Sequence, residues 1–376
     1  MADTAGGPGG RRDPYRVIVY GPGGLGTVAL YETHRLPEFE LVGVRAYSSR
    51  KDGVDAGSLL GLEPFGVAAS TDPEVLAGID CDCVLYTARD MGDHNTDDEI
   101  VSLLESGRNV VTPLPYQNAH LFREPGFVAR LERACQAGRS TFHATGIDPD
   151  IVTGRVALAL TGMCTRLDHL TIRETWPANK LDPALLRIVG FGLSPEEADN
   201  PLAAGISDSV LRSIGRSAER SLGVVYDRVE EVHEYVPTPR DIDIPGFPVR
   251  AGTVGCVSHS FVGFVGGEPF FTMQYNWVLG HDMLPAGIAP HERWVVEIEG
   301  TPSARLVIDM RGSLAGHRPY YQVGDARTDP GYHGTIAPCL QAIPFVVEAG
   351  PGVLPSFEPD LHWKSDLRDL APARSR

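Results

Sequence analysis

The sequence lacks several features that mark special classes of protein. Its 376 residues include six cysteines, and none of them forms the Cys-x-x-Cys pair that is typical of zinc sites and redox motifs. We therefore expect free thiols and a cytoplasmic protein. No apolar stretch approaches the roughly 18 residues that a membrane-spanning helix needs. No histidines, cysteines and acidic residues have the spacing of a metal site, so we assign no metal.

The sequence also has fewer basic than acidic residues. Lysine and arginine number 33 against 49 acidic residues, which gives a formal net charge of −16. Nucleic acid and anionic membranes would be repelled on average, so the partner we expect is a small molecule. The length suits about two domains. The first 14 residues are rich in Gly, Asp and Arg and have no hydrophobic signal region, so residues 1–14 are predicted to be a disordered leader.

Short apolar strands alternate with helices over the first part of the chain. Tyr15 to Tyr20 is an apolar run that ends at a glycine cluster, and the pattern continues to Thr145. This alternation predicts a parallel sheet with right-handed crossovers, an α/β Rossmann domain over residues 15–146. A helix near residue 73 would be capped at its N-terminus by Thr71. Another helix is expected from Thr27 to Arg35.

The pattern changes in the second part. Six longer segments alternate between apolar and polar residues, as in an open, mostly antiparallel sheet with one covered face. They are Leu170–Thr175, Val224–Val236, Thr253–Gly263, Phe270–Leu279, Arg293–Glu299 and Ala304–Met310. We expect an α+β domain with a mixed sheet over residues 147–334, and a helix over Thr335–Ala349 within a C-terminal segment, 335–376.

The glycine cluster is a Gly-x-Gly-x-x-Gly loop, Gly21-Pro22-Gly23-Gly24-Leu25-Gly26. It follows a predicted strand and precedes a predicted helix, which is the context of a dinucleotide-binding fingerprint. Gly21 would make the tight turn, Gly23 would let the backbone approach a diphosphate, and Gly26 would let the helix pack on the strand. Free N–H groups at the helix N-terminus favour phosphate.

The end of the second strand indicates which dinucleotide is bound. An NAD site usually places an acidic residue there to bind the ribose. This chain instead has Ser48-Ser49-Arg50-Lys51, with no acid before Asp52. Hydroxyls and cations suit a 2′-phosphate, so we favour NADPH over NADH.

Four stretches carry a likeness to a known group of enzymes. They are the Gly21–Gly26 loop, Asp55–Gly61, Ala144–Asp150 and Gln341–Val347. With them, the chain resembles the dihydrodipicolinate-reductase-like superfamily, and within it the branch of 2,4-diaminopentanoate dehydrogenase and the native amine dehydrogenases.

The resemblance implies a Rossmann domain to about residue 146, a substrate domain and a C-terminal helix that returns to the first domain. It also implies a homodimer built through the second domain, and hydride transfer to a carbon bonded to nitrogen. Three stretches would surround the nicotinamide: Thr87-Ala88-Arg89, Thr112 to Pro115 with Pro113 at its centre, and Thr145-Gly146-Ile147.

Two departures from the resembled enzymes matter. Dihydrodipicolinate reductases carry a His-His-x-x-x-Lys run, whereas the corresponding region here is Arg173-Glu174-Thr175-Trp176-Pro177. The amine dehydrogenases place a glutamate shortly after the fifth strand, and Pro115 occupies that position here. Proline cannot accept a proton, which puts ammonia-dependent amination in doubt and leaves reduction of a preformed imine or of a carbonyl.

Three residues are candidates for the chemistry, and two of them have a structural alternative. Tyr116 stands beside the replaced glutamate and would donate a proton or line the pocket. Glu174 would hold a cationic iminium or act as an acid, or else form an ion pair at the sheet edge. Asp148 would contact the substrate at the turn between the domains.

The sequence thus predicts an NADPH-dependent reductase of an imine, an iminium or a related carbonyl in a mostly apolar small molecule. One alternative is an amine dehydrogenase whose carboxylate comes from Glu174 or elsewhere. Another is a non-catalytic sensor that binds NADPH.

Overall fold

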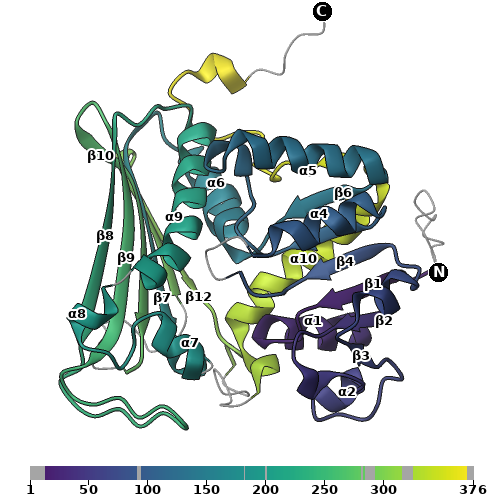
Figure 1. The fold of residues 1–376 in the computed structure, drawn as a ribbon. Helices are drawn as coiled ribbons and strands as arrows, with labels where there is room; N and C mark the ends of the chain where they lie inside the picture. The colour runs from purple at the N-terminus through teal and green to yellow at the C-terminus, as the bar shows by residue number, and fades with distance from the viewer. Residues whose placement is uncertain are drawn as a thin grey trace, which may run out of the picture.

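The computed structural model describes residues 13–90, 95–181, 183–199, 201–280, 283, 293–315 and 325–370, with backbone alone for 201–209 and 370. Two sheets organise this part of the chain, one of seven strands and one of six, with helices between them (Figure 1). Most of the predicted leader lies outside the described residues.

The seven-stranded sheet is parallel throughout, in the order β13-β6-β5-β4-β1-β2-β3. Its strands are β1 (Tyr15–Tyr20), β2 (Phe39–Arg45), β3 (Ala69–Ser70), β4 (Cys83–Tyr86), β5 (Asn109–Thr112), β6 (Thr141–Ala144) and β13 (Gly352–Val353). The connecting helices are α1 (Gly24–Arg35), α2 (Ala56–Leu59), α3 (Pro73–Ala77), α4 (Asp97–Glu105) and α5 (Pro125–Gly138). The predicted Rossmann-type α/β fold is confirmed.

Both faces of this sheet are buried, which explains the unbroken apolar strands. Val17 and Val19 of β1 face a core formed with α1 and with α10 (Pro330–Glu348), while Ile18 faces the core beneath α4 and α5. Helix α10 therefore returns from the end of the chain to cover the centre of the first sheet (Figure 1).

The six-stranded sheet has the order β12-β11-β7-β10-β9-β8. Its strands are β7 (Arg166–Pro177), β8 (Arg228–Pro237), β9 (Val254–Val265), β10 (Glu268–Val278), β11 (Arg293–Thr301) and β12 (Ala304–Asp309). The β7–β10 pair is parallel and the other pairs are antiparallel, so the predicted mixed sheet is confirmed.

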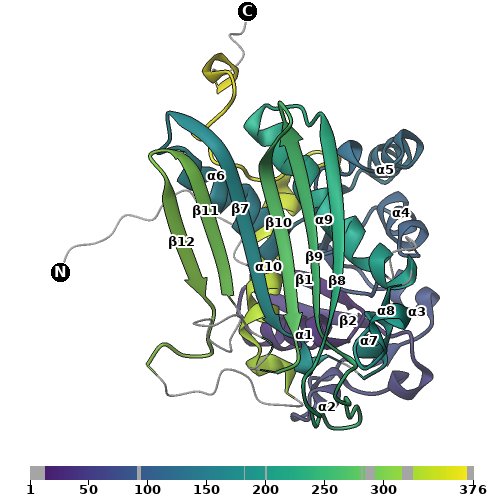
Figure 2. The same ribbon diagram turned by 90° about the vertical axis from the view of Figure 1, so that its left-hand side faces the viewer.

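One face of this sheet packs on η3 (Ile147–Ala157), α6 (Leu158–Thr161) and α9 (Pro201–Leu222). Short helices α7 (Pro183–Ile188) and α8 (Pro195–Ala198) lie toward one end of this sheet (Figure 1). Figure 2 shows the opposite face turned to the viewer, with no helix of the described residues in front of it. None of the described helices combines the length and the apolar character that a membrane span requires.

Several predicted boundaries were wrong for local reasons. Asp72, not Thr71, caps α3, since its carboxylate accepts the N–H of Glu74 at 2.9 Å while Thr71 is bound to Asp52. Helix α1 begins at Gly24, inside the glycine cluster, rather than at Thr27. Helix α10 begins at Pro330, five residues before the predicted Thr335, because Asp329 caps it there.

Candidate active site

The glycine loop between β1 and α1 is built for close backbone contacts. Gly21 has φ +83°, and a Cβ there would lie 2.5 Å from the Cα of Ala88. A Cβ on Gly26 would lie 2.1 Å from the carbonyl oxygen of Gly21. Gly23 is different, because the nearest atom to its Cβ position is 4.0 Å away. The loop is therefore closed toward the protein at Gly21 and Gly26 and open at Gly23, as a cradle for a diphosphate requires.

A cleft of about 850 Å³ runs from this loop to the second half of the molecule. It is lined by Gly21, Pro22, Gly23, Gly24, Leu25, Tyr47, Ser48, Lys51, Thr87, Ala88, Arg89, Asp90, Pro113, Leu114, Lys180, Leu181, Leu185, Ala326 and Tyr332. Most of the predicted cofactor residues are thus brought together at the carboxyl ends of the parallel strands. Gly26, Ser49, Arg50 and the Thr145-Gly146-Ile147 turn are not among the lining residues.

The loop after β2 borders the cleft with Tyr47, Ser48 and Lys51. The Lys51 ammonium donates a hydrogen bond to the carbonyl of Pro22, in the glycine loop, and burial lowers the pKa of Lys51. A dinucleotide on the loop would meet this cation directly. The predicted Arg50 lies in the same turn, where its N–H donates to the Ser48 hydroxyl at 3.4 Å.

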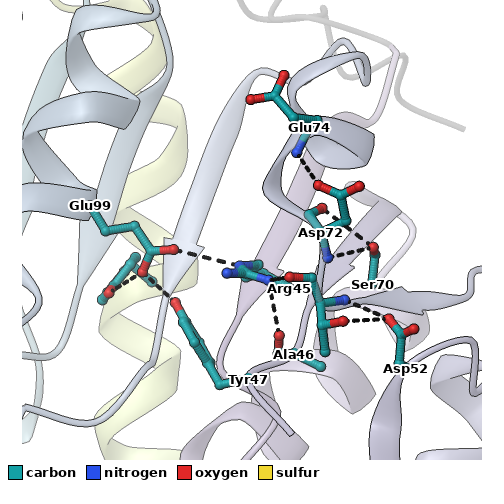
Figure 3. A network of polar contacts seen from close by, with 10 residues as sticks. Arg45, Ala46, Tyr47, Asp52, Ser70, Asp72, Glu74 and Glu99 are labelled. Carbon is teal, nitrogen blue, oxygen red and sulfur yellow. Dashed lines mark hydrogen bonds and ion pairs between the residues drawn. The ribbon is translucent and has the colours of Figure 1, made fainter. Parts of the chain in front are cut away.

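Tyr47 is held by a polar network that the sequence did not suggest (Figure 3). Its hydroxyl and that of Tyr86 both donate to Oε2 of Glu99, at 2.5 and 2.7 Å. The Arg45 guanidinium lies 4.8 Å from the centre of the Tyr47 ring and 3.6 Å from Oε1 of Glu99. Arg45 also donates to the carbonyls of Ala46 and Thr71. Because these contacts hold the Arg45 guanidinium within the protein, Arg45 is not directed at a ligand. The cation that borders this end of the cleft is Lys51.

The ends of β4 and β5 form the floor of the cleft. Thr87 is fixed by hydrogen bonds from its hydroxyl to the carbonyls of Tyr20 and Gly21, at 2.7 and 3.0 Å. Ala88, Arg89 and Pro113 follow on the same floor. The short or rigid side chains of Thr87, Ala88 and Pro113 leave room for a flat ring above them.

Tyr116 lies apart from the cleft, in the core between the first sheet and α5. Only 3% of it is exposed, and its ring packs against Phe127 and Phe142. Its hydroxyl donates to Asp97 at 2.5 Å and lies 2.9 Å from the Thr96 hydroxyl. Burial, and next the hydrogen bond to Asp97, raises the pKa of Tyr116 far above its ordinary value. The structure thus does not bring this predicted candidate to the cleft.

The Thr145-Gly146-Ile147 turn lies behind the wall of the cleft. The Thr145 hydroxyl donates to Oδ2 of the buried Asp150 at 2.5 Å. A Cβ on Gly146 would lie 3.7 Å from the Pro113 Cβ, so the turn packs directly on a lining residue. This contact sets the position of the residues that follow.

Asp148 is the first of these residues. Its Oδ1 accepts hydrogen bonds from the Thr153 hydroxyl and N–H, at 2.7 and 3.3 Å. Its Oδ2 is shielded from solvent and has no hydrogen-bond partner among the described residues, although the residue as a whole is half-buried. Burial raises the pKa of Asp148 to about 7. At neutral pH this carboxyl can therefore both donate and accept a proton.

Glu174 faces the same region from β7. It is half-buried and stands in register with Tyr275 of β10 on one side and Trp294 of β11 on the other. Tyr275 is buried, and its pKa is raised by that burial and then by the charges of Asp148 and Glu174. Asp148, Glu174 and Tyr275 thus form a cluster in which both acids act on one phenol, and none of the three is among the residues that line the cleft.

An aromatic row connects this cluster to the cleft. Tyr275 stacks on Trp277 at 6.2 Å between ring centres, and Trp277 lies 5.4 Å from Trp176. The ammonium of Lys180 lies 4.4 Å from the Trp176 ring centre, and Lys180 lines the cleft. Apolar walls with a few fixed polar groups are typical of small-molecule pockets.

Lys180 is the most distinctive residue that sequence reasoning missed. Its ammonium lies 2.8 and 2.7 Å from the two carboxylate oxygens of Asp329, and neither side chain is exposed. Tyr332 lies on the other side, 5.5 Å from ammonium to ring centre, and packs on Gly24 of the glycine loop. The one feature of the sequence that pointed to Lys180 was its position shortly after Trp176-Pro177. That stretch corresponds to the region in which dihydrodipicolinate reductases carry the His-His-x-x-x-Lys run. The described residues contain no cluster of three or more metal-ligating side chains.

Comparison with known proteins adds to this picture. Residues 151–361 match the family described as the 2,4-diaminopentanoate dehydrogenase C-terminal domain. An amine dehydrogenase of Streptomyces virginiae is 27% identical over 354 residues, which cover 91% of this chain and 95% of that protein. The 2,4-diaminopentanoate dehydrogenase of Acetoanaerobium sticklandii is 23% identical over 357 residues, covering 90% and 91%. Among solved structures, an amine dehydrogenase from Mycobacterium smegmatis superposes with a TM-score of 0.70 at 20% identity, covering 94% of this chain and 98% of that one. These findings confirm the branch suggested by the sequence.

Proposed function

Because the chain belongs to the family of the 2,4-diaminopentanoate dehydrogenase C-terminal domain, and is thereby an oxidoreductase, we propose that it uses NADPH to reduce the C=N bond of a small, mostly apolar imine or iminium, or a related carbonyl. The observation that carries this proposal is one cleft that joins the glycine loop to Lys180 and Tyr332 of the second half. A cofactor and a substrate would meet within it.

The residues present fit a dinucleotide. Gly23 leaves its backbone open to a diphosphate, and the loop ends at the N-terminus of α1. The floor formed by Thr87, Ala88 and Pro113 would carry the nicotinamide ring, which supplies the hydride when bound.

Lys51 and Ser48 support the choice of NADPH. Both line the cleft after β2, where a 2′-phosphate would lie, and the acid that would select NADH is not at that point. Asp52, the first acid in the loop, is bound to the N–H and hydroxyl of Thr71 at 2.7 and 2.8 Å. It is therefore not directed at a ribose.

Asp148 is the group best suited to move the proton. As the substrate carbon gains a hydride, its nitrogen needs a proton, and a carboxyl with a pKa of about 7 can deliver one at neutral pH. Glu174 would hold the cationic form of the substrate against the aromatic row of Trp176, Tyr275 and Trp277. Lys180 would fix the edge of the pocket through its ion pair with Asp329.

A second function, reductive amination of a ketone with ammonia, is favoured by the names of the two relatives and by the pair of carboxylates. The charges of Asp148 and Glu174 both raise the pKa of Tyr275, so both carboxylates act on the same side chain. A carboxylate from this cluster could replace the glutamate that Pro115 displaces.

We further propose the division of labour implied by the resemblance. Residues 15–146 would bind the cofactor, residues 147–334 the substrate, and residues 335–376 would return to the first part. The uncovered sheet face in Figure 2 would form the interface of a homodimer.

The test is a substrate panel with NADPH and NADH, together with calorimetry of both dinucleotides. Cyclic imines turned over without ammonia would support the reductase. Turnover only of ketones with ammonia would support the amine dehydrogenase. Tight NADPH binding without turnover would indicate a sensor, and binding of neither dinucleotide would overturn the proposal.

A further inference from the structure

A small cavity is lined by Pro149 and Thr153, the second of which binds Asp148. Its volume is about 10 Å³, close to what one water molecule needs. Among its lining residues are Gln117, Thr153, Ser221 and Glu358, which come from four separate parts of the chain. Apolar groups such as Leu158 and Leu170 complete the wall.

The side-chain amide of Gln117 indicates that the cavity can bind a small polar molecule. The side chain is 3% exposed, and neither Oε1 nor Nε2 has a hydrogen-bond partner among the described residues. A buried amide that is left unpaired costs about 1–3 kcal/mol, so such groups normally bind a water molecule. One water in this cavity would satisfy the amide.

Thr153 connects the cavity to Asp148. The hydroxyl donates to Oδ1 of Asp148 at 2.7 Å, and the threonine is 2% exposed. Because its one hydrogen is used toward Asp148, its oxygen is left as an acceptor for the cavity water.

Glu358 connects the cavity to solvent. Its Oε1 lies 2.7 Å from the Ser221 hydroxyl, its side chain is 18% exposed, and the Arg220 guanidinium lies 3.8 Å away. It is the acidic residue among those that line the cavity. Glu358 thus lies between solvent on one side and the cavity on the other.

We propose that Glu358, a water beside Gln117, and Thr153 form a proton path that recharges Asp148 from solvent. The inference rests on the proposed function, in which Asp148 loses one proton in each reduction. When the proton of Asp148 passes to the substrate nitrogen, Thr153 gives its hydroxyl proton to Oδ1 and receives one from the water. The water is restored by Glu358, and Glu358 by solvent. One proton enters for each one consumed, and rotation of the Asp148 carboxyl resets the path.

Glu358, Gln117 and Thr153 are positioning residues in this scheme, so the test must follow the proton itself. At pH 6, below the pKa of about 7, Asp148 carries its proton. We would mix the protein rapidly with D₂O and follow the carbonyl band of the protonated carboxyl by infrared spectroscopy. Asp148→Asn identifies the band.

The path predicts exchange at least tenfold slower in Thr153→Val and in Glu358→Gln. Thr153→Ser, which keeps a hydroxyl, and Asp360→Asn, which removes a nearby exposed carboxylate, should exchange at the parent rate. Glu358→Gln retains an acceptor for Ser221, so a folding defect is not expected there, and circular dichroism checks it.

Equal exchange rates in the parent, Thr153→Val and Glu358→Gln would overturn the path, as would the absence of an Asp148 band at pH 6. The measurement needs no turnover. Slow exchange in the variants combined with no reductase activity in the parent would therefore reject the proposed function and leave the path standing.

Discussion

Lys180 and Asp329 form an ion pair from which solvent is shut out, with the ammonium 2.8 and 2.7 Å from the two carboxylate oxygens. Asp329 also accepts the N–H groups of Gly331 and Tyr332 and so begins α10. The Asp329 carboxylate therefore binds both Lys180, which follows β7 and lines the cleft, and the N-terminus of α10.

Asp329→Asn should be strongly destabilising. The asparagine can still cap α10, but it leaves the buried ammonium without its counter-charge, which typically costs about 3–5 kcal/mol. Urea unfolding of parent and variant measures the difference. Asp325→Asn is the matched control, since Asp325 caps a 3₁₀ turn and its pair with Arg327 is partly exposed to solvent, so a loss of about 1 kcal/mol is expected. Similar losses in the two variants would contradict the importance of the buried pair.

Two glycines of one loop should respond differently to a single methyl group. Gly23→Ala places its methyl where the nearest atom is 4.0 Å away, so the fold should be unchanged while NADPH affinity falls at least tenfold. Gly26→Ala places its methyl 2.1 Å from a backbone oxygen, so the protein itself should lose about 1–3 kcal/mol. Thermal melting and calorimetry with NADPH separate the effects. Unchanged NADPH binding in Gly23→Ala would mean that the diphosphate lies elsewhere.

Lys51→Gln tests the choice of dinucleotide. A charge-assisted hydrogen bond is worth about 1.5–3 kcal/mol, so we expect at least a tenfold loss of NADPH affinity and a smaller loss for NADH. Arg50→Gln is the comparison, because Arg50 is not among the residues that line the cleft. Equal losses for both dinucleotides would show that Lys51 binds the diphosphate and not a 2′-phosphate.

The sequence predicted those parts of the site whose residues are neighbours in the chain. The glycine loop, the places of Ser48 and Lys51 and the alternation of strands and helices follow from local pattern and backbone chemistry, whereas Ser49 and Arg50 of the same turn do not line the cleft. Lys180 and Asp329 are 149 residues apart, so their pairing depends on the packing of two distant segments. The two-residue strands β3 and β13 were missed because such short pairings leave no periodic pattern.

Tyr116 illustrates a second limit. Its place beside Pro115 predicted a position near the nicotinamide, but the chain turns there and carries the ring into the core beneath α5. The segment does reach the cleft at Leu114, as its place in the sequence suggested. The direction of the Tyr116 side chain, however, is set by packing against Phe127 and Phe142.

Substitutions that remove one polar group each should distinguish the structural role of Tyr116 from the catalytic role of Glu174. Tyr116→Phe removes a hydroxyl bound to Thr96 and Asp97, so we expect about 1–2 kcal/mol less stability and turnover within twofold of the parent. Glu174→Gln should lower kcat at least tenfold, about 1.4 kcal/mol of barrier. Steady-state kinetics on the best imine checks both. A tenfold loss in Tyr116→Phe would restore the catalytic hypothesis for that residue.

Asp148 should make stability depend on pH in an unusual direction. Its pKa is raised from an ordinary 3.8 to about 7, so between these values the folded chain keeps a proton that the unfolded chain has lost. The stabilisation from this proton is complete below about pH 4 and is lost as pH rises through 7. A difference of about three pH units corresponds to about 4 kcal/mol. Asparagine cannot titrate, so Asp148→Asn should gain stability over the parent as pH rises from 4 to 8, while its kcat falls. Urea unfolding of both proteins across this range measures the gain. A constant difference between them would mean that Asp148 ionises at its ordinary pKa and cannot supply the proton at neutral pH.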